Sequence, residues 1–178
     1  MDAATPVRTA VAAHGLTPVA VLATHGHFDH VADAAALADG WGVPVWIHSA
    51  DAPMLSDPSW GLAPQLDGVG SLEQPREVRE FDGLETLTLA GLTFGLTHAP
   101  GHTPGGMIFR VGDVAFTGDT LFAGSIGRTD FAVSDHAAML RTLADLTALP
   151  DETAVLPGHG PRTSMARERA TNPFLAGL

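Results

Sequence analysis

The segment Thr24–His30 holds four potential metal ligands within six consecutive positions: His25, His27, Asp29 and His30. Neutral imidazole nitrogens and carboxylate oxygens are donors that Zn²⁺, Mn²⁺ and Fe²⁺ accept. A single histidine of this kind is usually a surface residue, but four donors so close together favour a metal site. Since they do not fit comfortably around one ion, the spacing indicates two metals.

Three further potential ligands, His102, Asp119 and His159, lie in downstream loops. Each follows a short apolar run and is flanked by Gly or Pro, residues that fix turns and let the backbone approach a site closely. A histidine in a glycine-rich turn is a weak signal by itself. The recurrence of such donors after three apolar runs strengthens the prediction of a metal site.

The first group of donors lies between a predicted strand, Val19–Ala23, and a predicted helix, Val31–Asp39, which is expected to end at Gly40. The pattern therefore predicts a ligand loop at the carboxyl end of a strand, where α/β proteins place their sites. The other predicted strands are Val43–His48, Val78–Phe81, Leu84–Leu89, Leu92–Thr97, Met107–Val111, Val114–Phe116 and Thr153–Leu156. The other predicted helices are Val7–His14, Ser134–Leu149 with Ser134 as N-cap, and Met165–Thr171. This interleaving predicts layers of helix and sheet.

The stretch Asp51–Gln74 is rich in Pro, Gly and Asp and is predicted to be irregular. Two roles are equally consistent with its apolar residues: they wall a pocket, or they fasten the loop to the core. These residues are Met54, Leu55, Trp60 and Leu62.

Composition limits the classes of function. The chain has 178 residues, which suits a single domain over 1–178, and a net charge of −11 with no Lys and nine scattered Arg. Nucleic-acid binding requires a basic stripe, so no nucleic-acid partner is expected. The absence of Cys excludes thiol nucleophiles and Cys-type zinc sites. No signal peptide or membrane span is predicted, and a cytoplasmic location without membrane association is expected.

The chain resembles the metallo-β-lactamase superfamily and, within it, the glyoxalase II-like thioester hydrolases. The resemblance rests on His25-x-His27-x-Asp29-His30 followed in order by His102, Asp119 and His159, and on the longer stretches Gly118–Phe131, Leu156–Pro161 and Arg167–Phe174. It implies an α+β fold of αββα-type layers. Relatives begin with further strands that this sequence does not show, so the fold is expected to be N-terminally incomplete.

The resemblance also implies which residues bind two divalent metals, with zinc expected and iron or manganese as alternatives. It assigns His25, His27 and His102 to the first metal, Asp29, His30 and His159 to the second, and Asp119 to both. Asp29 and Asp119 are the expected catalytic residues, and the expected partner is a small acyl-thiol substrate. Arg128 is expected either to bind a substrate carboxylate or, with slightly more weight, to form a structural ion pair with Asp130.

Two alternatives to thioester hydrolysis remain. One is an iron-dependent persulfide dioxygenase-like enzyme, in which His25, His102 and Asp119 would hold a single Fe²⁺. The other is an N-terminally truncated metal-binding fragment with little activity. Metal identity and oxygen uptake separate the first alternative from the hydrolase. The loop after Asp119 lacks the tyrosine of the larger glyoxalase II enzymes, since the chain has no Tyr, so the thiol carrier stays open.

Overall fold

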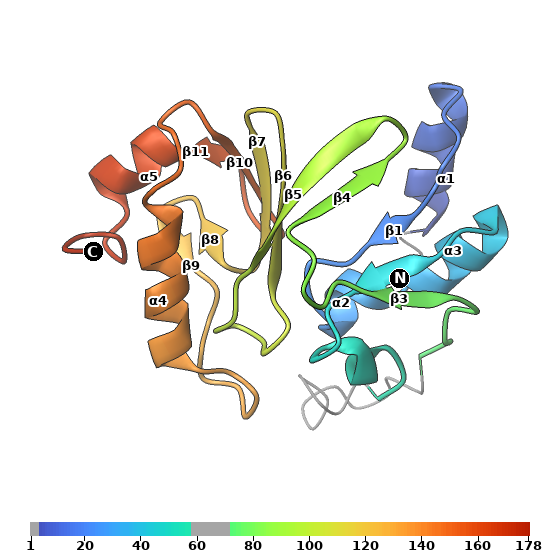
Figure 1. Cartoon of the computed structure of the whole chain (residues 1–178), viewed down its shortest axis with the longest axis horizontal. Coiled ribbons are helices and arrows are strands. Elements are labelled where there is room, and N and C mark those ends of the chain that lie inside the picture. Colours follow the sequence, from blue (N-terminus) through green and yellow to red (C-terminus); the bar gives the residue numbers. More distant parts are fainter. Residues whose placement is uncertain (1–3, 58–71) are drawn as a thin grey trace. The chain divides into compact units, whose positions relative to one another are not determined.

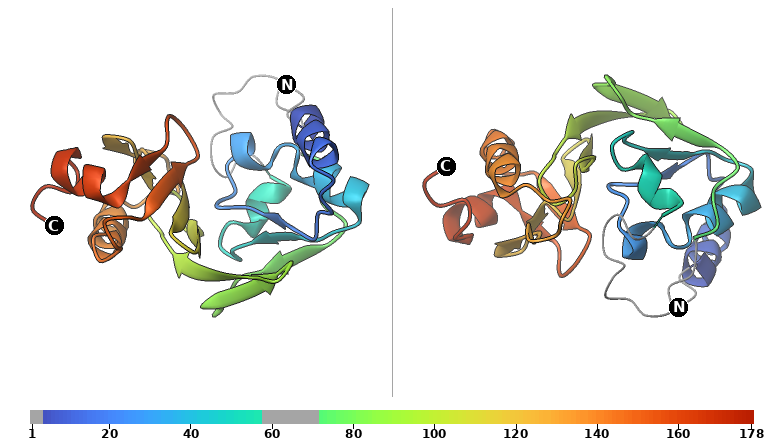
Figure 2. Two further views of the ribbon diagram at one scale, coloured as in Figure 1. Left: turned by 90° about the horizontal axis from the view of Figure 1, so that it is seen from above. Right: turned by 90° about the horizontal axis from the view of Figure 1, so that it is seen from below.

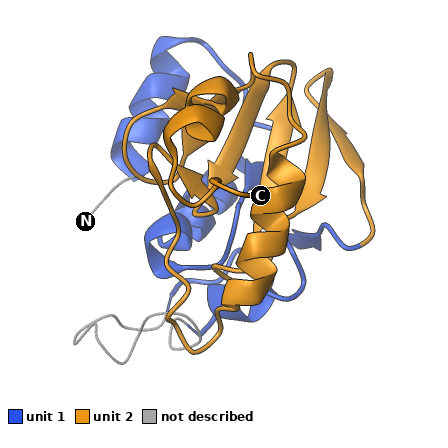
Figure 3. Cartoon of the chain, turned by 90° about the vertical axis from the view of Figure 1, so that its left-hand side faces the viewer, with its two compact units in different colours: residues 1–82 blue, residues 83–178 orange. Residues whose placement is uncertain are grey.

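A computed structural model describes residues 4–57 and 72–178 of the chain (Figure 1). The chain divides into two compact units, residues 1–82 and 83–178, which are coloured separately in Figure 3. Trp60 and Leu62, for which two roles are predicted, lie outside the described residues.

The first unit contains a short parallel sheet of strand order β1-β2-β3. Val45 of the central strand pairs with Val21 on one side and with Val78 on the other. Helix α3 packs against β1 and β2 and contacts α1 and α2. The elements are α1 (Ala4–Ala13), β1 (Val21–Leu22), α2 (Phe28–Val31), α3 (Ala34–Trp41), β2 (Val45–Ile47), η1 (Ala52–Leu55) and β3 (Val78–Glu80).

The helix predicted at Val31–Asp39 is wrong in both of its bounds. The structure forms two helices in this region, α2 and α3, and α3 continues through Gly40. Its end is set by Gly42, which adopts the left-handed conformation (φ 69°) and donates its N–H to the carbonyls of Ala38 and Asp39. Gly40 has a different role, because a side chain there would press on the Arg8 guanidinium, which donates to the Ala36 carbonyl.

The core of the first unit is built from small and branched apolar side chains. Its buried members are Ala23, Val31, Ala34, Ala38, Val45, Ile47 and Leu55. Leu55 therefore fastens the start of the predicted irregular stretch to this core, one of the two roles predicted for it.

The second unit contains a six-stranded sheet of order β11-β10-β7-β6-β5-β4. The pairings within β4–β7 are antiparallel, β10 runs parallel to β7, and β11 is antiparallel to β10. The strands are β4 (Thr86–Leu89), β5 (Leu92–His98), β6 (Met107–Val111), β7 (Val114–Gly118), β10 (Ala154–Pro157) and β11 (Thr163–Ser164), with a separate hairpin of β8 (Leu121–Phe122) and β9 (Ser125–Ile126).

The tight turn between β4 and β5 has a backbone conformation that suits a hairpin. Ala90 and Gly91 both have positive φ (51° and 78°), which matches the twist of a two-residue hairpin between β4 and β5. The predicted strands of this unit are confirmed within a few residues at their ends. The short strands β8, β9 and β11 were not predicted, because two residues are too few to show an alternating pattern.

Helices α4 (His136–Leu146) and α5 (Met165–Thr171) lie on the same face of the second unit's sheet (Figure 2). The predicted bounds of α5 are confirmed. The predicted N-cap of α4 is wrong: Asp135 caps the helix, its carboxylate accepting the Ala138 N–H at 2.9 Å, while the Ser134 hydroxyl donates to the His102 carbonyl at 2.7 Å. The core beneath these helices consists of Ala99, Ile108, Ala115, Leu121, Met139, Leu143, Leu146, Val155, Met165 and Leu175.

Among the helices of the described residues, none combines the length and the apolar character needed to span a lipid bilayer.

Candidate metal site

Three predicted ligands of the second unit lie beyond the carboxyl ends of strands that run in one direction. β7 and β10 are parallel neighbours, and β5 runs the same way because it is separated from β7 by one antiparallel strand. His102 follows β5, Asp119 follows β7 and His159 follows β10. The topology therefore gathers all three side chains at one edge of the sheet.

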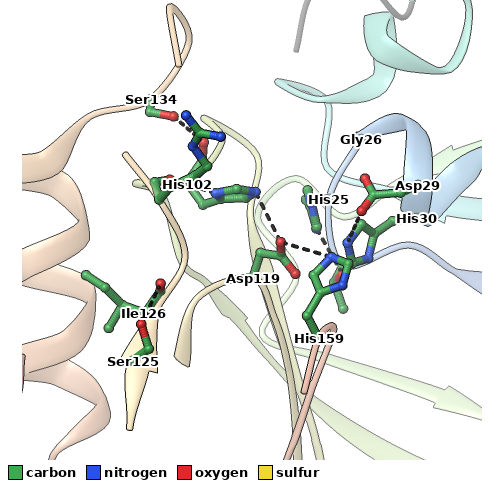
Figure 4. Close-up of polar contacts among 12 residues, drawn as sticks. His25, Gly26, Asp29, His30, His102, Asp119, Ser125, Ile126, Ser134 and His159 are labelled. Carbon is green, nitrogen blue, oxygen red and sulfur yellow. Dashed lines mark hydrogen bonds and ion pairs between the residues drawn. The ribbon is translucent and has the colours of Figure 1, made fainter. Parts of the chain in front are cut away.

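Asp119 lies between the two histidines (Figure 4). Its Oδ2 is 3.4 Å from His102 Nε2 and 3.5 Å from His159 Nε2. Two ligands held at about 2.1 Å from one tetrahedral metal lie about 3.4 Å apart. Both spacings thus fit pairs of ligands that share an ion, and Asp119 belongs to both pairs. Burial differs, since the side chains of Asp119 and His102 are 10% and 7% exposed and that of His159 is 54% exposed.

The His102 ring is oriented by a backbone carbonyl. Its Nδ1 lies 2.8 Å from the Arg128 carbonyl oxygen, which can only accept, so Nδ1 carries a proton and Nε2 is the ring nitrogen that faces Asp119. This is the arrangement that fixes the tautomer of a metal-binding histidine. The edge of the Phe131 ring also contacts this imidazole, with 5.7 Å between centroids.

Of the four predicted ligands of the first unit, His25 and His27 occupy the loop between β1 and α2, and Asp29 and His30 lie in α2 itself. The His25 ring lies 4.9 Å from the His27 ring and 4.0 Å from the His30 ring, centroid to centroid. His25 and His27 are 2% exposed, and Asp29 Oδ2 is 3.6 Å from His30 Nε2 (Figure 4). The turn forms because the His27 carbonyl accepts from the N–H groups of His30 and Val31. All four donors are therefore drawn into one small region of this unit.

Asp51 is a supporting residue that the sequence pattern does not reveal. It is fully buried, and its Oδ2 accepts the Gly26 N–H, between the two histidines, at 2.9 Å. Gly26 also has no room for a side chain: a Cβ there would lie 2.7 Å from Met54 Cβ and 2.8 Å from the Asp51 carbonyl oxygen. No local motif marks Asp51, because its contact spans 25 positions of sequence.

We expect Asp51→Ala to destabilise the chain by about 2–3 kcal/mol. The substitution removes a charged acceptor and leaves the buried Gly26 N–H without its hydrogen bond to Asp51. The His25–His27 loop should loosen with it, and zinc affinity should fall by about 10–100-fold, as for other residues that orient ligands. Chemical denaturation and competition with a zinc-binding dye measure the two effects. Asp51→Asn keeps an acceptor oxygen and should recover most of the loss; equal losses for both variants would contradict the role assigned to the hydrogen bond.

Arg128 forms the ion pair predicted as one of its two roles. Its guanidinium makes a two-pronged contact with the Asp130 carboxylate at 2.6 and 2.7 Å and lies 4.4 Å from the centroid of the Phe131 ring. The side-chain hydrogen bond raises the pKa of Arg128 above its ordinary value and lowers that of the Asp130 carboxyl. Binding of a substrate carboxylate by Arg128 stays a prediction, and the carboxylate of Asp130 would compete with it.

Three of the remaining histidines have structural contacts. His98 Nε2 lies 2.8 Å from the Pro104 carbonyl oxygen, and His136 Nδ1 lies 2.9 Å from the Thr129 hydroxyl. His48 Nδ1 accepts from the Ala50 N–H at 3.2 Å, and its Nε2 is 3.4 Å from Asp82. These contacts agree with the absence of all three from the predicted ligand set.

Residues 2–159 match the family model described as the metallo-beta-lactamase superfamily. The hydroxyacylglutathione hydrolase GloC of Haemophilus influenzae is 38% identical over 159 residues, which cover 87% of this chain and 74% of that protein.

Two solved structures are similar over 98% of this chain. The crystal structure of the BLEG-1 B3 metallo-beta-lactamase has a TM-score of 0.90 and 35% identity, with 85% of that chain covered. The crystal structure of TTHA1623 in a di-iron-bound form has a TM-score of 0.82 and 38% identity, with 86% of that chain covered.

Proposed function

Because the chain belongs to the metallo-beta-lactamase superfamily, we propose that it is a metal-dependent hydrolase that cleaves thioesters with the help of two metal ions. The observation that carries the proposal is the position of Asp119. Its carboxylate lies at metal-sharing distances from both His102 and His159, which is the arrangement expected of a bridging ligand.

The proposed ligand sets follow the family pattern. One metal would be held by His25, His27 and His102. The other would be held by Asp29, His30 and His159. Asp119 would bind both metals. The donor chemistry supports this, since these residues offer only imidazole nitrogens and carboxylate oxygens, which suit zinc, iron and manganese. Zinc is the proposed metal, and the di-iron form of TTHA1623 makes iron the alternative to test against it.

Bound metals would polarise the acyl carbonyl and activate water near neutral pH. The residues of the chain supply position and charge. Asp119 and Asp29 would contribute two negative charges that offset the charge of the metals, and Asp29, whose side chain is 45% exposed, would orient the attacking water by accepting a hydrogen bond from it. His102 Nδ1 would donate its proton to the Arg128 carbonyl oxygen and so hold the orientation of the ring.

Thioesters are the proposed substrates for two reasons. A thiol has a pKa near ~8.5, so its thiolate leaves without a strong general acid. The similarity to GloC, a hydroxyacylglutathione hydrolase by name, points to the same bond. The chain itself has no Cys that would act as an alternative nucleophile.

The test uses the purified chain and a hydroxyacyl thioester such as lactoylglutathione, followed by release of free thiol without oxygen. We expect hydrolysis that is lost on chelation and restored by zinc or manganese, with about two metals per saturated chain by elemental analysis. A saturated content of one metal or none would contradict the two-metal site. An inert thioester assay, combined with oxygen consumption on a persulfide in the presence of Fe²⁺, would replace the hydrolase with the dioxygenase alternative.

A further inference from the structure

A cavity of about 260 Å³ lies wholly within the second unit, between strands β5 and β6 and the C-terminal half of helix α4. Thr97 and Ile108 face each other across the two strands at its base. Strand β6 contributes Arg110 to the lining of the cavity. Helix α4 and the turn after it contribute Asp145, Leu146 and Leu149. None of these residues belongs to the proposed ligand sets.

The cavity carries one charge of each sign on opposite walls. In the part of the chain that the structure describes, neither the Arg110 guanidinium nor the Asp145 carboxylate has a hydrogen-bond or ion-pair partner. The Arg110 side chain lies beside Gly95, its cross-strand partner, and a Cβ at Gly95 would meet the guanidinium only at an ordinary contact distance of 3.7 Å. A cation and an anion are thus both exposed and available to a ligand.

The base of the cavity is apolar. Ile108 is fully buried, Leu146 is 4% exposed, and Leu149 packs partly buried against the same core. The Thr97 hydroxyl adds a donor and acceptor beside this surface. A ligand that fits must therefore carry a short apolar group together with a charged head.

We propose that this cavity binds a small zwitterion of the amino-acid type with an aliphatic side chain. The carboxylate would pair with the Arg110 guanidinium, whose planar fork suits it, and the ammonium would pair with Asp145. The aliphatic group would cover Ala148 and Leu149, the apolar residues of the lining whose side chains are still exposed or partly exposed. The volume lies just below the range of about 300–1,000 Å³ for small-molecule sites, which favours a ligand of this size over a nucleotide or a coenzyme.

The cavity also borders the side chains that hold the His102 loop. Thr142, on its wall, donates to the Pro100 carbonyl at 2.8 Å, and His98, also on its wall, contacts the Pro104 carbonyl at 2.8 Å. The two contacts hold the backbone on either side of His102. A ligand in the cavity would therefore change the environment of the loop that carries this proposed metal ligand, although its binding does not depend on the proposed hydrolysis.

The experiment titrates the full chain with L-leucine and follows backbone amide resonances by NMR. We expect saturable shifts at Thr97, Ile108 and Arg110 and smaller shifts at Gly101 and Thr103 in the His102 loop. Two probes that keep the isobutyl group of leucine test the two charges separately: 4-methylpentanoate lacks the ammonium and 3-methylbutylamine lacks the carboxylate. Each should bind at least about tenfold more weakly than leucine.

Arg110→Gln and Asp145→Asn should each weaken leucine binding at least about tenfold and leave thioester hydrolysis without added leucine unchanged. Arg141→Gln is the matched control, because Arg141 is exposed on α4 and does not line the cavity. Unchanged leucine affinity in both cavity variants, or no saturable shift in the parent chain, would overturn the proposal. Equal affinity for leucine and 4-methylpentanoate would also overturn it, since the site would then recognise a carboxylate alone.

Discussion

Asp119→Ala is expected to abolish hydrolysis and to lower the metal content below one ion per chain. The carboxylate lies at metal-sharing distances from both His102 and His159, so its removal takes a ligand from both proposed metals at once. Loss of metal-assisted stabilisation worth several kcal/mol corresponds to a fall in kcat/KM of about a thousandfold or more. Thiol release and elemental analysis of the same sample measure both effects.

The matched control for this variant is Asp113→Ala, which removes an exposed carboxylate in the turn between β6 and β7. Its activity and metal content should equal those of the parent chain. Asp119→Asn adds a second comparison, because it keeps the shape and removes the charge, and it should recover metal only in part. Full activity in Asp119→Ala would show that the proposed site is in the wrong place.

Gly127→Ala should have the second largest effect, through the backbone rather than through a ligand. A Cβ at this position would lie 1.8 Å from the Asp119 carbonyl oxygen and 3.2 Å from His102 Nδ1. The Asp119 backbone must therefore move, and it carries the proposed bridging carboxylate with it. We expect a destabilisation of about 3 kcal/mol or more, together with a large loss of metal affinity.

Gly124→Ala separates this clash from ordinary glycine strain. Gly124 has φ 73°, but a Cβ at this position would meet no atom within 4 Å, so the substitution should cost only about 1–2 kcal/mol and leave metal affinity unchanged. Chemical denaturation and zinc competition would be run on both variants in parallel. If Gly127→Ala were as mild as Gly124→Ala, the close approach of Gly127 to Asp119 would not constrain the site.

The candidate ligands and the fold class were predictable from the sequence. His25, His27, Asp29 and His30 form a local pattern, and His102, Asp119 and His159 each follow a short apolar strand. The predicted metallo-β-lactamase fold is confirmed by the family match and by the likeness to BLEG-1. The predicted bounds of α5, Met165–Thr171, are also confirmed, and the structure shows Ser164 as the N-cap of this helix.

The supporting contacts of the site and the N-cap of α4 depend on contacts between segments that are far apart in the sequence. Asp51 reaches Gly26, the Arg128 carbonyl reaches His102, and Ser134 bonds to the His102 carbonyl instead of capping α4. The sequence pattern reports local preference and periodicity, and several residues near each other could cap a helix equally well. Which of them does so depends on the hydrogen-bond partners that other strands and loops bring within reach.

The cavity beside Arg110 also depends on tertiary contacts and not on a local sequence pattern. The sequence shows an arginine in a strand and an aspartate in a helix, which is usual for solvent-exposed faces. Only the register of β5 with β6, which sets Gly95 opposite Arg110, and the packing of α4 over these strands place the two charges around one apolar hollow. The sequence by itself indicated the candidate metal ligands and the strands that precede them, because those signals are local, although Asp29 and His30 lie in helix α2 and not in the expected loop. The tertiary structure determined the supporting contacts and the second cavity, because burial and hydrogen bonding join residues that are far apart in the chain.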